Sequence, residues 1–345
     1  GLTGAYELGS VSDAAYETEH AITLTGLASA RTHHYRVQSR GLNGVNTISG
    51  DELFCTASGP EAGGEIRVWF NKVVDTTLAL GTPAEGLVNL PGKLVERIDA
   101  AQYSIDACIY SFDLASVADA LIAAQQRGVA VRFIYDDRDG AGYQYEVQRL
   151  QAAGIPVIDD AFGSNDGNGL MHNKFFIFDH RNGSPDDADD WLWTGSHNVT
   201  SAGSYTDAQN VIAIQDAALA EIYTVEFNEM WGSDTDTPNA ALSRFGANKT
   251  ANTPQRAWVQ GTPMRVFFSP SDGVVGAIRN EIAGAESSIH FAILSFTRDD
   301  ISNDLKGKWL YTPGFELRGV FDHAELGNTS SVYHDMIGTG PEPWS

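Results

Sequence analysis

From Glu65 onward, short apolar runs alternate along the chain with amphipathic segments of helical period. The expected strands are 66–70, 104–111, 129–135 and 156–158, and the expected helices are 87–101, 115–126, 143–153 and 216–231. Gly128 and Gly154 directly follow two of these helices, where a glycine commonly ends a helix. Because strands and helices alternate in this way, we expect an α/β sandwich.

Two strand patterns recur near the end of the chain. Segment 103–112 recurs as 287–296, an offset of 287 minus 103, or 184. Segment 131–136 recurs as 317–322, an offset of 317 minus 131, or 186. A repeat of this kind indicates a second lobe with the same architecture as the first.

The polar residues best suited to chemistry lie at two strand ends. His172 and Lys174 stand two residues apart where a strand is expected to begin, so their side chains project from the same face. Four apolar residues, 175–178, then bury that strand, and a second apolar strand, 191–194, runs into the segment 195–198. We therefore expect the two strand ends to converge on one pocket, where a histidine and a lysine hold and attack a phosphate.

This constellation resembles the signature of the phospholipase D superfamily, through the pattern His172-x-Lys174, four residues, Asp179, then Gly195-Ser196-x-Asn198-x-Thr200-x-x-Gly203. The resemblance extends from about residue 65 to residue 345. It implies a phospholipase D-like α-β-α sandwich lobe at 65–250, followed by an incomplete second lobe at 263–345. It also implies a phosphodiesterase that hydrolyses or transfers a phosphodiester through a phosphohistidine, without a metal or another cofactor.

The resemblance assigns catalytic roles to four residues. His172 is expected to attack phosphorus, since neutral imidazole is a nucleophile that leaves again. Lys174 and Asn198 are expected to neutralise the non-bridging oxygens, where the transition state gathers charge. Four strand residues separate Asp179 from Lys174, so we expect Asp179 to anchor the neighbouring hairpin rather than to touch phosphate.

The residues expected to bind substrate or support the site are Gly195, Ser196, His197 and Gln209. Gln209 stands where the family commonly carries a glutamate that orients the nucleophilic histidine, and its carbonyl oxygen is expected to accept the ring N–H without a carboxylate's charge. The hairpin after Asp179 is also long, and its acidic run 186–190 is interpreted as a solvated turn, with calcium capture as the alternative. For Asp136 and Asp137, which close a buried strand, loop capping is favoured over substrate contact.

A larger departure is the missing second histidine. Members of the family join two such strands, and one histidine attacks while the other protonates the leaving oxygen. The repeat offset of 186 would place the counterpart of His172 at 358, beyond Ser345. We therefore interpret the sequence as a fragment that is weakly active or inactive alone, with the missing lobe expected in the same full-length chain.

Residues 1–58 are interpreted as a separate all-β module. The expected strands at 21–27, 33–40 and 51–55 resemble the second half of a fibronectin type III domain, and a linker follows at 58–64. Because such companions are typical of extracellular bacterial enzymes, a secreted or cell-surface location is expected. No leader precedes this module, and the chain begins with glycine rather than methionine, so this start is not expected to be the original one.

Charge narrows the expected substrates. Lys and Arg number 22 against 45 Asp and Glu, which gives a net charge of −23, and such a surface repels long nucleic acid. A phospholipid head group or another small diester is therefore favoured, and a nuclease of the same superfamily is the alternative within enzymes. Gln209 and the missing second histidine leave a non-catalytic extracellular binding or scaffold module as a further alternative.

Two further features of the sequence concern membrane spanning and cysteine pairing. No apolar run is long enough to span a bilayer, so no transmembrane segment is expected. Cys55 and Cys108 fall in different modules and are expected to be unpaired.

Overall fold

The computed structural model describes residues 1–60, 63–79, 81–137, 144–167, 169–182 and 188–337. The chain divides into two compact units, Gly1–Phe268 and Ser269–Ser345.

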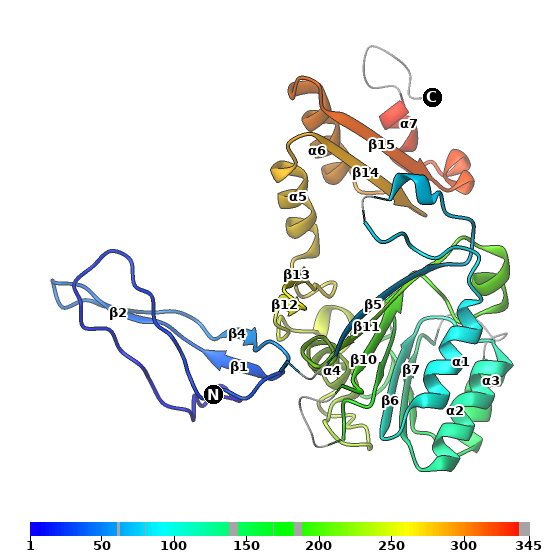
Figure 1. Cartoon of the computed structure of the whole chain (residues 1–345), viewed down its shortest axis with the longest axis horizontal. Helices are drawn as coiled ribbons and strands as arrows, with labels where there is room; N and C mark the ends of the chain where they lie inside the picture. Colours follow the sequence, from blue (N-terminus) through cyan, green and yellow to red (C-terminus); the bar gives the residue numbers. More distant parts are fainter. Residues whose placement is uncertain (61–62, 80, 138–143, 168, 183–187, 338–345) are drawn as a thin grey trace. The chain divides into compact units, whose positions relative to one another are not determined.

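A seven-stranded sheet forms the centre of the first unit (Figure 1), with the order β5-β11-β10-β9-β6-β7-β8. Its strands are β5 (Gly63–Phe70), β6 (Ser104–Ile109), β7 (Ala130–Tyr135), β8 (Val157–Asp159), β9 (Lys174–Phe178), β10 (Trp191–Gly195) and β11 (Asn210–Asp216). Strands β6, β7 and β8 are parallel, and the other neighbours pair antiparallel. The mixed sheet confirms the α/β class, whereas β11 was not predicted.

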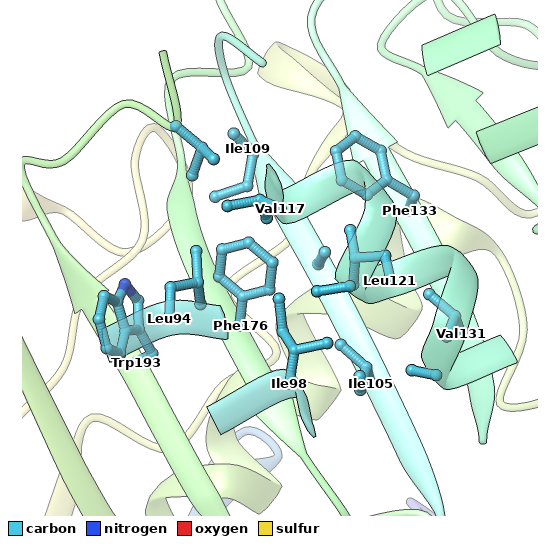
Figure 2. Packing of buried hydrophobic residues seen from close by; sticks show 14 of the residues in the cluster. Leu94, Ile98, Ile105, Ile109, Val117, Leu121, Val131, Phe133, Phe176 and Trp193 are labelled. Carbon is cyan, nitrogen blue, oxygen red and sulfur yellow. The ribbon is translucent and has the colours of Figure 1, made fainter. Parts of the chain in front are cut away.

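Helices cover both faces of this sheet (Figure 1). They are α1 (Leu90–Ala100), α2 (Ala115–Arg127) and α3 (Gln144–Ala152) on one face and α4 (Ala217–Trp231) on the other. Figure 2 shows Leu94 and Leu121 of the first face packing near Phe176. On the opposite face, Phe227 of α4 shares a core with Ile177. The uninterrupted apolar run of β9 follows from this layering, because a strand buried on both faces needs no polar alternation.

The ends of two helices show how the sequence sets their limits. Helix α1 begins three residues later than expected, because Leu87 has a φ of 59° and Asn89 caps the helix by accepting a hydrogen bond from the Gly92 N–H. Helix α2 ends at Gly128, whose φ of 96° is left-handed, as predicted.

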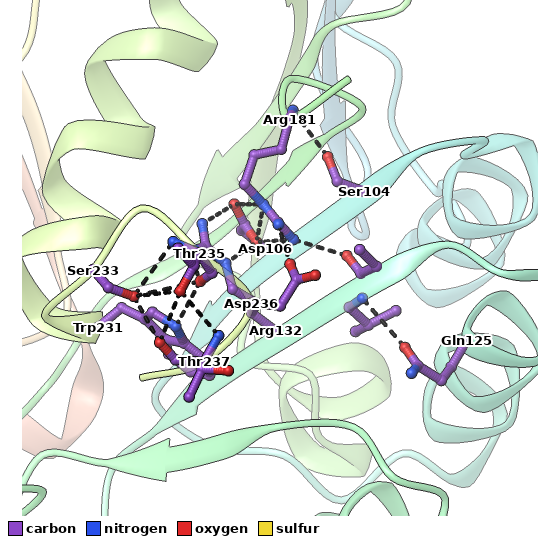
Figure 3. A network of polar contacts seen from close by, with 12 residues as sticks. Ser104, Asp106, Gln125, Arg132, Arg181, Trp231, Ser233, Thr235, Asp236 and Thr237 are labelled. Carbon is purple, nitrogen blue, oxygen red and sulfur yellow. Dashed lines mark hydrogen bonds and ion pairs between the residues drawn. The ribbon is translucent and has the colours of Figure 1, made fainter. Parts of the chain in front are cut away.

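A buried ion network joins β6 and β7 (Figure 3). Arg132 donates to both carboxylate oxygens of Asp106, at 2.7 and 2.6 Å, and both side chains are almost fully buried. Arg181 donates to the same carboxylate at 3.1 Å, and its far end pairs with the exposed Asp236. Two guanidinium groups therefore neutralise one buried carboxylate. Together they lower its pKa, although burial alone would raise it.

The second unit repeats part of the first. It contains α5 (Val274–Gly284), β14 (Ser288–Ile293), α6 (Asp299–Tyr311), β15 (Glu316–Phe321) and α7 (Tyr333–Ile337). The parallel pair β14–β15 places Ser288 opposite Glu316, as β6–β7 places Ser104 opposite Ala130. The differences, 288 minus 104 and 316 minus 130, equal the sequence offsets of 184 and 186. The internal repeat is therefore confirmed down to strand register.

The N-terminal residues form two small antiparallel pairs, β1 (Thr32–Tyr35) with β4 (Glu52–Cys55), and β2 (Gln38–Arg40) with β3 (Asn46–Ile48). The expected strand at 21–27 does not form, and the expected strand at 33–40 is interrupted. All residues of β2 and β3 are exposed, so little packing supports further pairing. The strands fit an all-β segment, and the fibronectin resemblance stays a prediction.

A hairpin, β12 (Arg256–Val259) with β13 (Thr262–Arg265), completes the first unit. Both cysteines are free, as expected. Among the helices that the structure describes, none combines the length and the apolar character needed to cross a bilayer.

Candidate active site

The His-x-Lys segment lies where β9 enters the sheet beside the end of β6. His172 precedes β9 by two residues, and Lys174 is the first residue of the strand. The N–H of Tyr110, which directly follows β6, donates to the carbonyl of Asn173 at 2.9 Å. The ammonium group of Lys174 donates to the carbonyl of His172 at 2.9 Å. The backbone of the segment is therefore held to the central strand.

The side chains of His172 and Lys174 contact the same aromatic ring. The imidazole of His172 lies 4.6 Å from the ring of Tyr110, centroid to centroid, at an interplanar angle of 60°. The ammonium nitrogen of Lys174 lies 5.0 Å from the same centroid. His172 itself is exposed. The two side chains therefore lie on one side of the segment, as the spacing predicts, with the imidazole open to solvent.

The end of β10 places the segment 195–198 beside the start of β9. Thr194 of β10 pairs with Phe175 of β9, and Val199 forms a bridge with Phe112, beyond the end of β6. Because β9 lies between β10 and β6, the segment 196–198 crosses the edge of the sheet at which β9 begins. The two strand ends therefore lie side by side, as predicted, and the pocket expected between them stays a prediction.

Asn198 lies in this crossing segment. Its side-chain oxygen is buried and accepts no hydrogen bond within the described part of the chain. A buried carbonyl oxygen without a donor is costly, so this atom is suited to a ligand group that donates a hydrogen bond. Ser196 is engaged differently, because its hydroxyl accepts from the backbone and side-chain nitrogens of Asn210 at 3.0 and 3.2 Å. Ser196 therefore ties the turn to β11.

Gly195 permits a close backbone approach at the end of β10. Its φ is 154°, and a Cβ atom there would lie 2.3 Å from the carbonyl oxygen of Asn210. Any larger residue would push β10 and β11 apart at the point where the turn begins.

His197 is a buried residue of the turn. Its ring pairs with the hydroxyl of Ser204 at 2.9 Å, and only 2% of the residue is exposed. Burial lowers the pKa of His197 to about 4, so the ring is neutral. Of the two roles considered for it, this placement favours support of the turn over contact with substrate.

Asp179 lies at the far end of β9 from Lys174. Its carboxylate accepts hydrogen bonds from the backbone N–H groups of Gln102, Tyr103 and Ser104, at 2.9, 2.6 and 3.2 Å. We expected the anchor to be the neighbouring hairpin, but the carboxylate instead fixes the entry to β6. Asp179 thus positions the strand that carries Tyr110 at its other end.

Gln209 does not orient His172. Its backbone N–H donates to the side chain of Asn71 at 2.8 Å, and no hydrogen bond joins its side chain to His172 within the described residues. The predicted bond to the imidazole is therefore wrong for this structure. A side chain ending in a neutral amide also lacks the long-range attraction that would draw a carboxylate toward the ring.

The pKa of His172 lies below its ordinary value. Partial burial is the main cause, and the charge of Lys174 adds to it, while the carboxylate of Asp136 opposes both. A lowered pKa keeps the imidazole neutral near neutral pH. A ring nitrogen with a free electron pair is the form that attacks phosphorus.

An acidic group near the site was not predicted. The carboxylates of Asp136, Asp137 and Asp160 offer oxygens that lie within 4.8 Å of one another, close enough to share one cation. Asp136 accepts from the Met171 N–H at 2.7 Å, which confirms loop capping, and Asp160 accepts from the Asp137 N–H at 3.1 Å. Burial raises the pKa of Asp160 to about 6. Sequence alone could not join Asp160 to the other two, because Asp136 and Asp137 follow β7 whereas Asp160 follows β8.

The acidic run after Asp179 is only partly described. Asp186 and Asp187 lie outside the described residues. Asp190 is buried and pairs with His180 at 2.9 Å, so this part of the run is not a solvated turn.

Comparisons with known proteins agree with the motif. A family model described as "Cardiolipin synthase, PLD-like domain" matches residues 94–231. A phospholipase D of Rickettsia prowazekii is 33% identical over 159 residues, which cover 46% of this chain and 67% of that protein. A mitochondrial cardiolipin hydrolase of Xenopus tropicalis is 30% identical over 131 residues, which cover 38% of this chain and 56% of the relative. The chain thus spans little more than half the length of that relative.

Among solved structures, the phospholipase D family member Nuc from Salmonella typhimurium is similar to this chain. The two share 24% sequence identity with a TM-score of 0.37, over 48% of this chain and 93% of Nuc.

Proposed function

Since the chain belongs to the phospholipase D superfamily, we propose that it is a phosphodiesterase that works through a covalent phosphohistidine on His172. The observation that carries this proposal is the shared placement of His172 and Lys174 on the ring of Tyr110, at the start of β9 where the end of β10 pairs with it. An exposed, neutral imidazole beside a fixed positive charge is what attack on an anionic diester needs.

The proposed reaction has two steps. A ring nitrogen of His172 attacks phosphorus, so a P–N bond forms while the P–O bond to the leaving group breaks, and the departing oxygen takes up a proton. Water then attacks phosphorus and releases a proton to solvent, the P–N bond breaks, and His172 regains its free electron pair. A second histidine as the acid of the first step remains a prediction from the resemblance.

Two groups are proposed to stabilise the charge that develops on the non-bridging oxygens. Lys174 supplies a positive charge held beside the nucleophile. Asn198 supplies a side-chain amide whose N–H groups are proposed to donate to these oxygens. Loss of one such preorganised donor typically lowers the rate on the order of a hundredfold to a thousandfold.

A phospholipid head group is the substrate class we propose. Relatives named phospholipase D and cardiolipin hydrolase support this choice. The net charge of −23 disfavours long nucleic acid, because that polymer meets repulsion well beyond the contact region. Secretion rests only on the fibronectin resemblance, and relatives named as mitochondrial lend it no support.

The substrate class is tested by comparing two kinds of diester. Vesicles of phosphatidylcholine and phosphatidylethanolamine are incubated with a chain extended past residue 345, and release of choline or ethanolamine is compared with cleavage of single-stranded DNA. We expect head-group release that His172→Ala abolishes and that Lys174→Met lowers on the order of a hundredfold to a thousandfold. Lys93→Met, an exposed lysine on α1 paired with Glu96, is the matched control and should retain activity. DNA cleavage without head-group release would assign the nuclease activity instead.

The chemistry is tested separately with bis(p-nitrophenyl) phosphate. Nitrophenolate is a weakly basic leaving group, so the first step needs no acid from the protein. We expect a burst of nitrophenolate that approaches one equivalent per chain, because His172 is consumed once before water regenerates it. A parent protein without a burst or turnover would favour the non-catalytic binding module.

A further inference from the structure

We infer that Tyr110 is a positioning residue, whose ring holds the imidazole of His172 and the ammonium group of Lys174 in the arrangement that attack on phosphorus requires. The inference rests on the proposed function and adds a residue that the sequence motif does not contain. Tyr110 lies 62 residues before His172 in the chain, 172 minus 110, and reaches it through the pairing of β6 with β9.

Both contacts of the Tyr110 ring have the geometry of attractive interactions. Aromatic rings attract one another at centroid separations of roughly 4.5–7 Å, and the imidazole of His172 lies at 4.6 Å with a 60° tilt. A cation is attracted to a ring face within about 6 Å, and the Lys174 nitrogen lies at 5.0 Å. One ring therefore attracts both the nucleophile and the charge that neutralises the phosphate.

The ring is carried by a rigid part of the fold. Tyr110 directly follows β6, all of whose residues are buried. Its backbone N–H also donates to the carbonyl of Asn173, the residue between His172 and Lys174. Both the backbone and the side chain of Tyr110 thus contact the segment from His172 to Lys174. A displacement of the ring would therefore displace the imidazole of His172.

No hydrogen bond replaces this restraint on the imidazole. Within the described residues, the ring nitrogens of His172 make no hydrogen bond, and the side chain of Gln209 does not reach them. An exposed histidine without such a bond would otherwise sample several rotamers at a cost in entropy. The ring of Tyr110 is therefore the contact that orients His172.

The test compares Tyr110→Leu with Tyr110→Phe. Leucine removes the aromatic face, and phenylalanine retains it. We expect Tyr110→Leu to lower the rate constant of the nitrophenolate burst roughly tenfold with little change in KM, because both attractions act on the reacting groups. Tyr110→Phe should recover most of that loss. The acid limb of the pH profile should also move in Tyr110→Leu, because the substituted ring contacts the titrating imidazole.

Tyr103→Leu is the matched control. Tyr103 lies before β6, at the end opposite to Tyr110, and is 49% exposed. We expect its burst rate to equal that of the parent. A parent-like rate in Tyr110→Leu, an equal loss in Tyr103→Leu, or a Tyr110→Phe variant as slow as Tyr110→Leu would each overturn the inference.

Two further measurements keep the test decisive. If thermal melting shows that Tyr110→Leu does not fold, Tyr110→Met takes its place, because methionine fills the space without an aromatic face. An NMR titration of the His172 ring, made without substrate, separates this inference from the proposed function. A pKa of His172 that differs between Tyr110→Leu and the parent supports the contact even where no burst occurs, and an unchanged pKa contradicts it.

Discussion

The carboxylate of Glu221 on α4 lies 3.1 Å from the ring of His180, and it also accepts a hydrogen bond from the backbone N–H of Thr32. The other ring nitrogen of His180 pairs with Asp190 at 2.9 Å. A buried histidine therefore sits between two carboxylates, one of which also holds the N-terminal segment. Arg31 of that segment reaches Glu221 at 3.3 Å.

This cluster predicts that stability falls at alkaline pH. Burial alone would lower the pKa of His180, but the hydrogen bonds to Asp190 and Glu221 outweigh it and raise the pKa to about 9. A raised pKa stabilises the fold below the ordinary value of about 6.5, and the contribution disappears as pH rises through 9. The full contribution is on the order of 3 kcal/mol.

Urea unfolding between pH 6 and pH 10 checks this prediction. The free energy of unfolding of the parent should fall across about pH 7 to 9, and that of His180→Gln should fall less, because its side chain does not titrate. Parallel pH curves for the two proteins would contradict the role assigned to His180.

Breaking the ion network of Figure 3 should be costly only at its buried end. Asp106→Asn leaves two guanidinium groups without their carboxylate, so we expect a loss of roughly 3–5 kcal/mol. Asp236→Asn is the matched control, because its carboxylate is exposed, and it should cost under about 1 kcal/mol. Equilibrium unfolding in urea measures both, and equal losses would contradict this assignment.

Gly195→Ala should disturb the site more than Gly128→Ala. Both glycines have positive φ values, 154° and 96°, but only at Gly195 does an added Cβ meet backbone, the carbonyl of Asn210 at 2.3 Å. Gly128→Ala should therefore cost about 1–2 kcal/mol and leave the burst rate intact. Gly195→Ala should lower both stability and burst rate, because Asn198 follows in the displaced turn. A normal burst rate in Gly195→Ala would show that the turn adapts.

Lys174→Met should shift the pH dependence of the burst as well as its rate. The positive charge of Lys174 lowers the pKa of His172, after burial as the larger cause. Removal of that charge raises the pKa, so the acid limb moves to higher pH. Stopped-flow measurements of the burst rate against pH locate the acid limb in the parent and in Lys174→Met. An unmoved limb would mean that Lys174 does not act on the titrating group.

The elements that sequence predicted best are those with long apolar patterns. Uninterrupted apolar runs predicted the strand that begins after His172 and the strand that ends at Gly195. They also predicted the repeat of β6 and β7, because such runs are compatible with few other structures. The strand β11 was missed because its beginning, after Gln209, resembles a polar loop. The expected strand at 21–27 failed because no buried face supports it.

The contacts that complete the site join residues far apart in sequence. Tyr110 meets His172 only through the pairing of β6 with β9, and Asp160 meets Asp136 only through the pairing of β7 with β8. A motif fixes identities along one strand, but the neighbour across the sheet depends on strand order. That order became visible only in the folded chain.

The covalent intermediate is the most direct test of the account. The protein is mixed with bis(p-nitrophenyl) phosphate, quenched in base to preserve a P–N bond, digested and analysed by mass spectrometry. We predict a nitrophenyl phosphoryl group on the peptide that contains His172, formed at the rate of the burst and absent from His172→Ala. Turnover with no such adduct, or an adduct on another residue, would contradict the mechanism.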